Sequence, residues 1–99
     1  MSLITEAQIR GLVLVAEGGL SDRQLAVWDV LKIEPEVWVP EPGAEHGFGF
    51  WVVARSDGDV LWYDSMNEGF CYGKALAEGI LPDPEMGPAP LHRLIEDSD

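Results

Sequence analysis

The chain is poor in thiols, imidazoles and positive charge: its 99 residues include one cysteine, two histidines and only six lysines and arginines. A single thiol, Cys71, cannot form an internal disulfide, so a hydrophobic core must hold the fold, as suits a reducing compartment. Two histidines without a cysteine cluster give no zinc-site spacing. The scarcity of cations argues against direct nucleic-acid binding, because phosphate contacts need clustered lysine and arginine.

Long apolar runs are also missing. The longest, at residues 12–16, is far shorter than a membrane span of about 20 residues. Residues 1–8 lack the charged start and apolar stretch of a signal peptide. We therefore expect a cytoplasmic protein that does not enter the membrane.

Negative charge and apolar residues, by contrast, are abundant. Eighteen aspartates and glutamates give a formal net charge of −12, yet 46% of the residues are hydrophobic and four are tryptophan. Disordered acidic tails are poor in aromatic residues, so this composition indicates a folded domain with an acidic surface. Such a surface repels nucleic acids and anionic lipids and favours a basic protein partner, although solubility alone would also account for it.

Two capping-box patterns predict a helical hairpin over residues 1–33. Thr5 and Ser21 each stand at an N-cap position, with a glutamine three residues later and apolar residues following at helical spacing. Gly18 is expected to end the first helix, and Pro35 to close the second near residues 32–33.

Residues 36–73 predict an antiparallel meander. Its expected strands are residues 37–39 at an edge, 48–55, 60–64 and 70–72. An Asp57-Gly58 turn between the two central strands is a strong hairpin signal. One helical turn is expected at residues 74–79. The Pro-rich tail, residues 80–99, is expected to cross the surface in extended form and end in a short helix.

Helices followed by strands indicate an α+β fold rather than alternating βαβ units. We expect a single compact domain over residues 1–99. Its N-terminal helical hairpin should pack on one face of a three- to four-stranded antiparallel sheet, followed by the Pro-rich tail.

One spacing imitates a calcium site. Asp57, Asp59 and Glu68 match the first, third and last ligands of a calcium loop. Leu61 and Trp62, however, stand where that loop needs an oxygen ligand and a glycine. We interpret the segment as a hairpin and expect no bound metal.

Other catalytic signatures are equally weak. Cys71 lies in an expected strand, where a cysteine acts as a small apolar group, and His46 beside Glu45 stands in an expected loop. The sequence has neither a phosphate-binding Gly-Lys-Ser/Thr loop nor a Gly-x-Ser-x-Gly elbow. We expect no cofactor and no catalytic residues, and hence a non-enzymatic protein.

The central hairpin predicts a sheet that is apolar on both faces. A two-residue turn places Val53 opposite Trp62, so Trp51 and Trp62 are expected to share one face. A half-solvated sheet would instead alternate apolar and polar residues. The helices can cover one face, and the other must meet the tail, a second copy or a partner.

In size and charge the chain is similar to small acidic bacterial or phage proteins that bind and block another protein, such as immunity proteins. We therefore expect an inhibitor-like domain that docks on a basic protein. The residues predicted to contact that partner are Trp38, Trp51 and Trp62 as apolar anchors and Glu34, Glu36, Glu41, Glu45 and Asp64 as a charged rim. Two alternatives stay open: a ligand-binding or enzymatic domain with a tryptophan-lined pocket, and a homodimer formed through the sheet.

Overall fold

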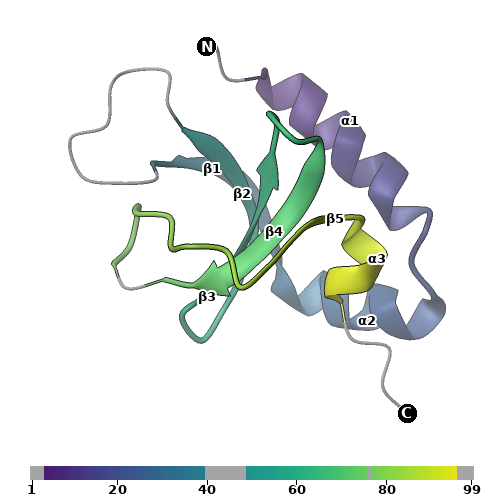
Figure 1. Cartoon of the computed structure of the whole chain (residues 1–99). Helices are drawn as coiled ribbons and strands as arrows, with labels where there is room; N and C mark the ends of the chain where they lie inside the picture. The colour runs from purple at the N-terminus through teal and green to yellow at the C-terminus, as the bar shows by residue number, and fades with distance from the viewer. Residues whose placement is uncertain (1–3, 40–48, 76, 96–99) are drawn as a thin grey trace.

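A computed structural model describes residues 4–39, 49–75 and 77–95. Their elements, in chain order, are α1 (Glu6–Glu17), α2 (Asp22–Leu31), β1 (Lys32–Trp38), β2 (Phe50–Ser56), β3 (Asp59–Asp64), β4 (Gly69–Lys74), β5 (Met86–Ala89) and α3 (Leu91–Leu94). Over these residues the strands form one open antiparallel sheet in the order β1-β2-β3-β4-β5, and the helices pack against it (Figure 1). The α+β class is confirmed.

Both capping boxes are confirmed. In α1 the Thr5 hydroxyl accepts from the Gln8 backbone N–H at 3.1 Å, and the Gln8 side chain accepts from the Thr5 N–H at 2.8 Å. Ser21 and Gln24 repeat this exchange at the start of α2, at 3.1 and 2.9 Å. Each pair satisfies backbone donors that a helix start leaves without partners.

The central hairpin is also confirmed. Asp57 and Gly58 have φ values of 46° and 87°, the left-handed pair that a type I′ turn requires. The residues after the turn continue as β3 and cannot wrap a cation. The segment with the calcium-like spacing is therefore a hairpin.

The predicted register of this hairpin holds from the turn to the Ala54–Leu61 pair and is wrong beyond it. The observed Cα partners across β2 and β3 are Trp51–Tyr63, Val52–Trp62, Ala54–Leu61 and Arg55–Val60. Val53 is the extra residue of a β-bulge, which reverses the alternation of side chains beyond it. Trp51 and Trp62 consequently lie on opposite faces of the sheet, not on the same one.

Each face of the sheet carries its own core. The core under the helices contains Ile9, Leu20, Trp28, Val53, Ala54, Leu61, Tyr63, Phe70, Leu91 and Ile95. The core on the other face contains Trp38, Val52, Val60, Trp62, Cys71 and Leu81. The tail is thus divided, because Leu81 covers the second face while Leu91 and Ile95 pack under the helices. The second face is covered within the monomer, since Trp62 is only 5% exposed.

The tail differs from expectation in two places. Met86–Ala89 forms a fifth strand, with Phe70 opposite Ala89, so the prediction of three to four strands is too low. A proline is tolerated there because β5 is an edge strand of the described sheet. The expected helical turn at residues 74–79 is wrong as well: Ala77 and Ile80 form a β-bridge around a turn at Gly79, where φ is 86°.

The end of the tail matches the prediction, since residues 91–94 form the short helix α3. None of the helices in the described ranges is long and apolar enough to cross a membrane.

Candidate protein-binding site

The structure places the predicted tryptophan anchors largely inside the molecule. Trp38 and Trp62 are 3% and 5% exposed, which makes them core residues. Trp51 is half-buried beneath the N-terminus of α1, and its indole N–H donates to the Ile4 carbonyl oxygen at 2.8 Å. Their packing and the hydrogen bond of Trp51 stabilise the fold.

The predicted acidic rim is only partly brought together. Glu34 and Glu36 both lie on β1, and the side chain of Glu34 is 84% exposed. Asp64 accepts the backbone N–H groups of Met66 and Asn67 at 2.9 and 3.2 Å, so it holds the turn between β3 and β4. Glu41, Glu45 and His46 lie outside the described residues.

Three of the cations around β1 are each paired with two carboxylates. The pairs are Arg10 with Glu6 and Glu34, Lys32 with Asp29 and Glu17, and Arg55 with Glu78 and Glu36. The hydrogen bonds that Arg10 donates to Glu34 and then to Glu6 raise its pKa, and the hydrogen bond that Lys32 donates to Asp29 raises the pKa of Lys32. Such exposed pairs add little stability. They do leave this side of the molecule negative, because each cation is outnumbered.

The apolar side chains exposed on α1 are a feature that the sequence analysis missed. Since Ile9, Val13 and Ala16 pack toward the sheet, Leu14 and Val15 point outward. They are 69% and 79% exposed. The sequence could have predicted this exposure. When the apolar run at residues 12–16 is placed on a helix, these two residues lie outside the buried face.

Gly11 completes this strip. A Cβ atom added to Gly11 would meet nothing within 4 Å, so the backbone is open to close approach there. We call Gly11, Leu14 and Val15 the outer face of α1. It is uncharged in an otherwise acidic molecule.

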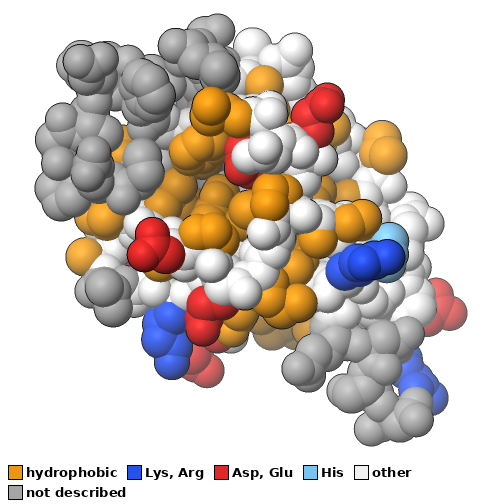
Figure 2. Space-filling model, in the orientation of Figure 1, with side chains coloured by type: hydrophobic (Ala, Val, Ile, Leu, Met, Phe, Trp, Pro, Cys, Tyr) orange, Lys and Arg blue, Asp and Glu red, His pale blue; other side chains and the backbone are white. Residues whose placement is uncertain are grey.

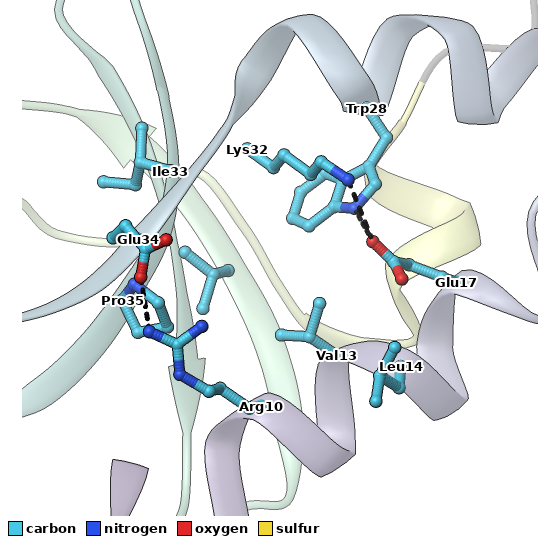
Figure 3. Close-up of a pocket in the computed structure, with 10 residues that line it drawn as sticks. Arg10, Val13, Leu14, Glu17, Trp28, Lys32, Ile33, Glu34 and Pro35 are labelled. Carbon is cyan, nitrogen blue, oxygen red and sulfur yellow. Dashed lines mark hydrogen bonds and ion pairs between the residues drawn. The ribbon is translucent and has the colours of Figure 1, made fainter. Parts of the chain in front are cut away.

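A groove of about 590 Å³ runs along one side of this face, between α1 and β1 (Figure 3). Leu14 lines it beside an apolar floor formed by Val13, Trp28, Ile33, Pro35 and Val53. Figure 3 shows charged groups at its rim: Arg10 from α1 reaches Glu34 of β1, and Glu17 meets Trp28 and Lys32. The groove therefore combines an apolar floor with a charged margin.

A second groove, of about 460 Å³, lies on the other side of α1 toward β5 and α3. Val15 lines it, together with Leu12 and Ala16 from α1 and Phe70, Pro88, Ala89, Pro90 and Leu91 opposite. Figure 2 shows hydrophobic side chains gathered over β4 and β5, which border this groove. The outer face of α1 is thus a ridge between two largely apolar grooves.

Cys71, one of the two residues considered for chemistry, does not line either groove. It is 2% exposed in the second core, and burial, followed by the charge of Asp64, raises the pKa of its thiol to about 11. A thiol in that state is a poor nucleophile near neutral pH. Among the described residues, no group of three or more His, Cys, Asp or Glu side chains is placed to hold a metal ion.

Comparison with protein-family models, with curated proteins and with solved structures finds no match to this chain.

Proposed function

We propose that the chain is a small non-enzymatic protein-binding domain that docks on a basic partner through the outer face of α1. The observation that carries this proposal is the exposure of Leu14 and Val15 between two largely apolar grooves. Contiguous apolar surface rimmed by polar groups usually marks an interaction site. Covering such a surface requires another molecule.

The energetics fit an interface with a few apolar anchors. Burying a leucine or valine side chain contributes about 1.5–3 kcal/mol relative to leaving it in water. Anchors of this kind generally lie at the centre of an interface, inside a polar rim. Leu14 and Val15 occupy the centre here, and Glu17, Glu34 and Glu68 lie along the grooves.

The net charge of the chain indicates that the partner's surface is positively charged. The chain carries a net charge of −12, so two copies of it repel each other, whereas a basic surface is attracted and steered. Docking would cover that basic surface and block any polyanion that it otherwise binds. This is the way in which a small acidic protein could act as an inhibitor.

The test compares the wild type with Leu14→Glu and Val15→Glu, using Val30→Glu as the matched control. Val30 is 82% exposed on α2 and lines neither groove. Val30→Glu therefore makes the same kind of substitution away from the proposed interface. Proteins retained by each immobilised variant from a lysate of the source organism would be identified, and the best candidate purified for affinity measurement.

We expect a basic protein that binds the wild type and Val30→Glu equally and binds both α1 variants at least about tenfold more weakly. Its association rate should fall markedly between low salt and about 0.5 M salt. Equal binding by all four proteins, or an acidic partner with a salt-independent rate, would contradict the proposal.

A further inference from the structure

A separate cavity of about 500 Å³ opens between α2, α3 and the turn end of the β2–β3 hairpin, on the side of the sheet that carries the helices. Its size lies within the range of about 300–1,000 Å³ that is usual for small-molecule sites. Most of its walls are apolar side chains: Val27, Leu31, Ala54, Leu61, Met86, Leu94 and Ile95. Such a cavity with a few polar groups is a typical binding site for a small ligand.

Asp59 supplies one of those polar groups. It lines the cavity, and its Oδ1 atom is removed from solvent without any hydrogen-bond partner. Most buried polar atoms in proteins are paired, and an unpaired one costs about 1–3 kcal/mol. Lys74 is opposite Asp59 in the register of β3 and β4, yet the ion pairs of the described residues do not join them. The carboxylate therefore has unused capacity to accept a hydrogen bond.

Arg93 supplies a group of the opposite sign. It stands on α3, lines the same cavity and is exposed, and it forms no ion pair with the residues that the structure describes. Arg55 also lines the cavity, but Glu36 and Glu78 hold its guanidinium, which lies over the Trp38 ring at 5.0 Å. Asp59 and Arg93 are therefore the unpaired charges of this cavity among the described residues.

We propose that this cavity binds a small zwitterion with an apolar side chain, namely a free apolar α-amino acid such as leucine. Its ammonium group donates to the Asp59 carboxylate, and its carboxylate accepts from the Arg93 guanidinium. Its side chain contacts the apolar wall that includes Leu31 and Leu94. Rotation about the broad χ2 torsion of Asp59 presents either oxygen to the ligand.

Other ligand classes use the cavity less completely. A purely apolar molecule leaves Asp59 without a donor, and a carboxylic acid is repelled by it. A simple amine satisfies Asp59 and leaves Arg93 without a partner. The expected order of affinity is therefore amino acid, then amine, then acid. This site is distinct from the outer face of α1 and does not depend on the proposed docking function.

The experiment titrates the full chain with L-leucine, with leucinamide, which lacks the carboxylate, and with 4-methylpentanoate, which lacks the amine. Binding is followed by amide and methyl chemical shifts in the wild type, Asp59→Asn and Arg93→Gln. The matched control is Asp57→Asn, because Asp57 is exposed at the turn tip with a φ of 46° that asparagine adopts readily.

We expect L-leucine to bind the wild type and Asp57→Asn with the same affinity and to shift signals of Leu31, Tyr72 and Leu94. Asp59→Asn should weaken leucine binding at least about tenfold, and Arg93→Gln should bring leucine and leucinamide within about twofold of each other. Asp59→Asn removes an unpaired carboxylate, so its melting temperature should equal or exceed that of the wild type. This keeps loss of binding distinguishable from loss of fold.

Three results would overturn the proposal. They are the absence of a saturable shift with all three compounds up to about 10 mM, unchanged leucine affinity in Asp59→Asn, and shifts confined to α1.

Discussion

The indole N–H of Trp28 donates a hydrogen bond of 2.6 Å to a carboxylate oxygen of Glu17, which joins α2 to the last turn of α1. Trp28 is fully buried, whereas the Glu17 side chain is 22% exposed. The buried indole N–H therefore has its hydrogen-bond acceptor in a carboxylate at the rim of the first groove.

Replacing that carboxylate should weaken the helical hairpin. Glu17→Ala leaves the buried N–H without an acceptor and should lower the free energy of unfolding by about 1–3 kcal/mol, whereas Glu17→Gln keeps an acceptor and should lose less. Urea denaturation measures both. Glu6→Ala, which breaks an exposed ion pair with Arg10 and removes an exposed carboxylate from the first turn of α1, should cost about 0.5 kcal/mol or less. Equal losses in Glu17→Ala and Glu6→Ala would refute the role of Glu17.

Gln24 connects the N-cap of α2 to α3 and the residue that follows it. Its side-chain amide donates to the carbonyl oxygens of His92 and Ile95 at 2.7 and 2.8 Å, while its oxygen accepts from Ser21. Gln24→Glu keeps the cap but loses both donors, so it should cost at least about 1 kcal/mol. Gln8→Glu is the control, because Gln8 has the same cap at an exposed position and should change stability by less than about 0.5 kcal/mol. Similar effects in thermal unfolding would show that the contact with α3 is unimportant.

The buried thiol should make stability fall at alkaline pH. Burial and then Asp64 raise the pKa of Cys71 to about 11, whereas an unfolded thiol titrates near 8.5. Between these values the unfolded chain binds fewer protons than the folded one, so stability decreases as pH rises. From pH 8 to 10 the wild type should lose about 1–2 kcal/mol more than Cys71→Ala. Parallel profiles would contradict the assignment.

Replacement of glycine by alanine should have opposite effects on stability at two positions. Gly11 lies within α1 and a Cβ there has open space, so Gly11→Ala should stabilise the domain by about 0.5–1 kcal/mol. Gly87 has a φ of 104°, and a Cβ there would collide with the Phe70 carbonyl oxygen and the Cys71 backbone. Gly87→Ala should therefore disrupt the pairing of β5 with β4. Differential scanning calorimetry separates the two, and a stabilised Gly87→Ala would show that β5 is not paired as described.

The elements that the sequence predicted best depend on neighbouring residues. The Thr5 and Ser21 caps and the Asp57-Gly58 turn are local devices whose hydrogen bonds or φ values are set within three residues. They were sufficient to place the two helices, the central hairpin and the α+β class.

The features that were missed depend on distant contacts. The bulge at Val53 has no glycine or other local marker, and its effect is seen only once β2 and β3 are paired. β5 forms because β4 offers an edge, which overrides the low strand propensity of Pro88. Composition does not reveal burial either, since two of the predicted anchors, Trp38 and Trp62, are in the core.

Both outer strands of the described sheet contain a proline, Pro35 in β1 and Pro88 in β5. Proline has no N–H to donate, and β1 also exposes Glu34 and Glu36. A further strand, from a partner or from another copy, would therefore have to pair with an outer strand that has fewer backbone donors. Because both outer strands are poor templates for a further strand, we expect the concentrated protein to resist the growth of cross-β fibrils.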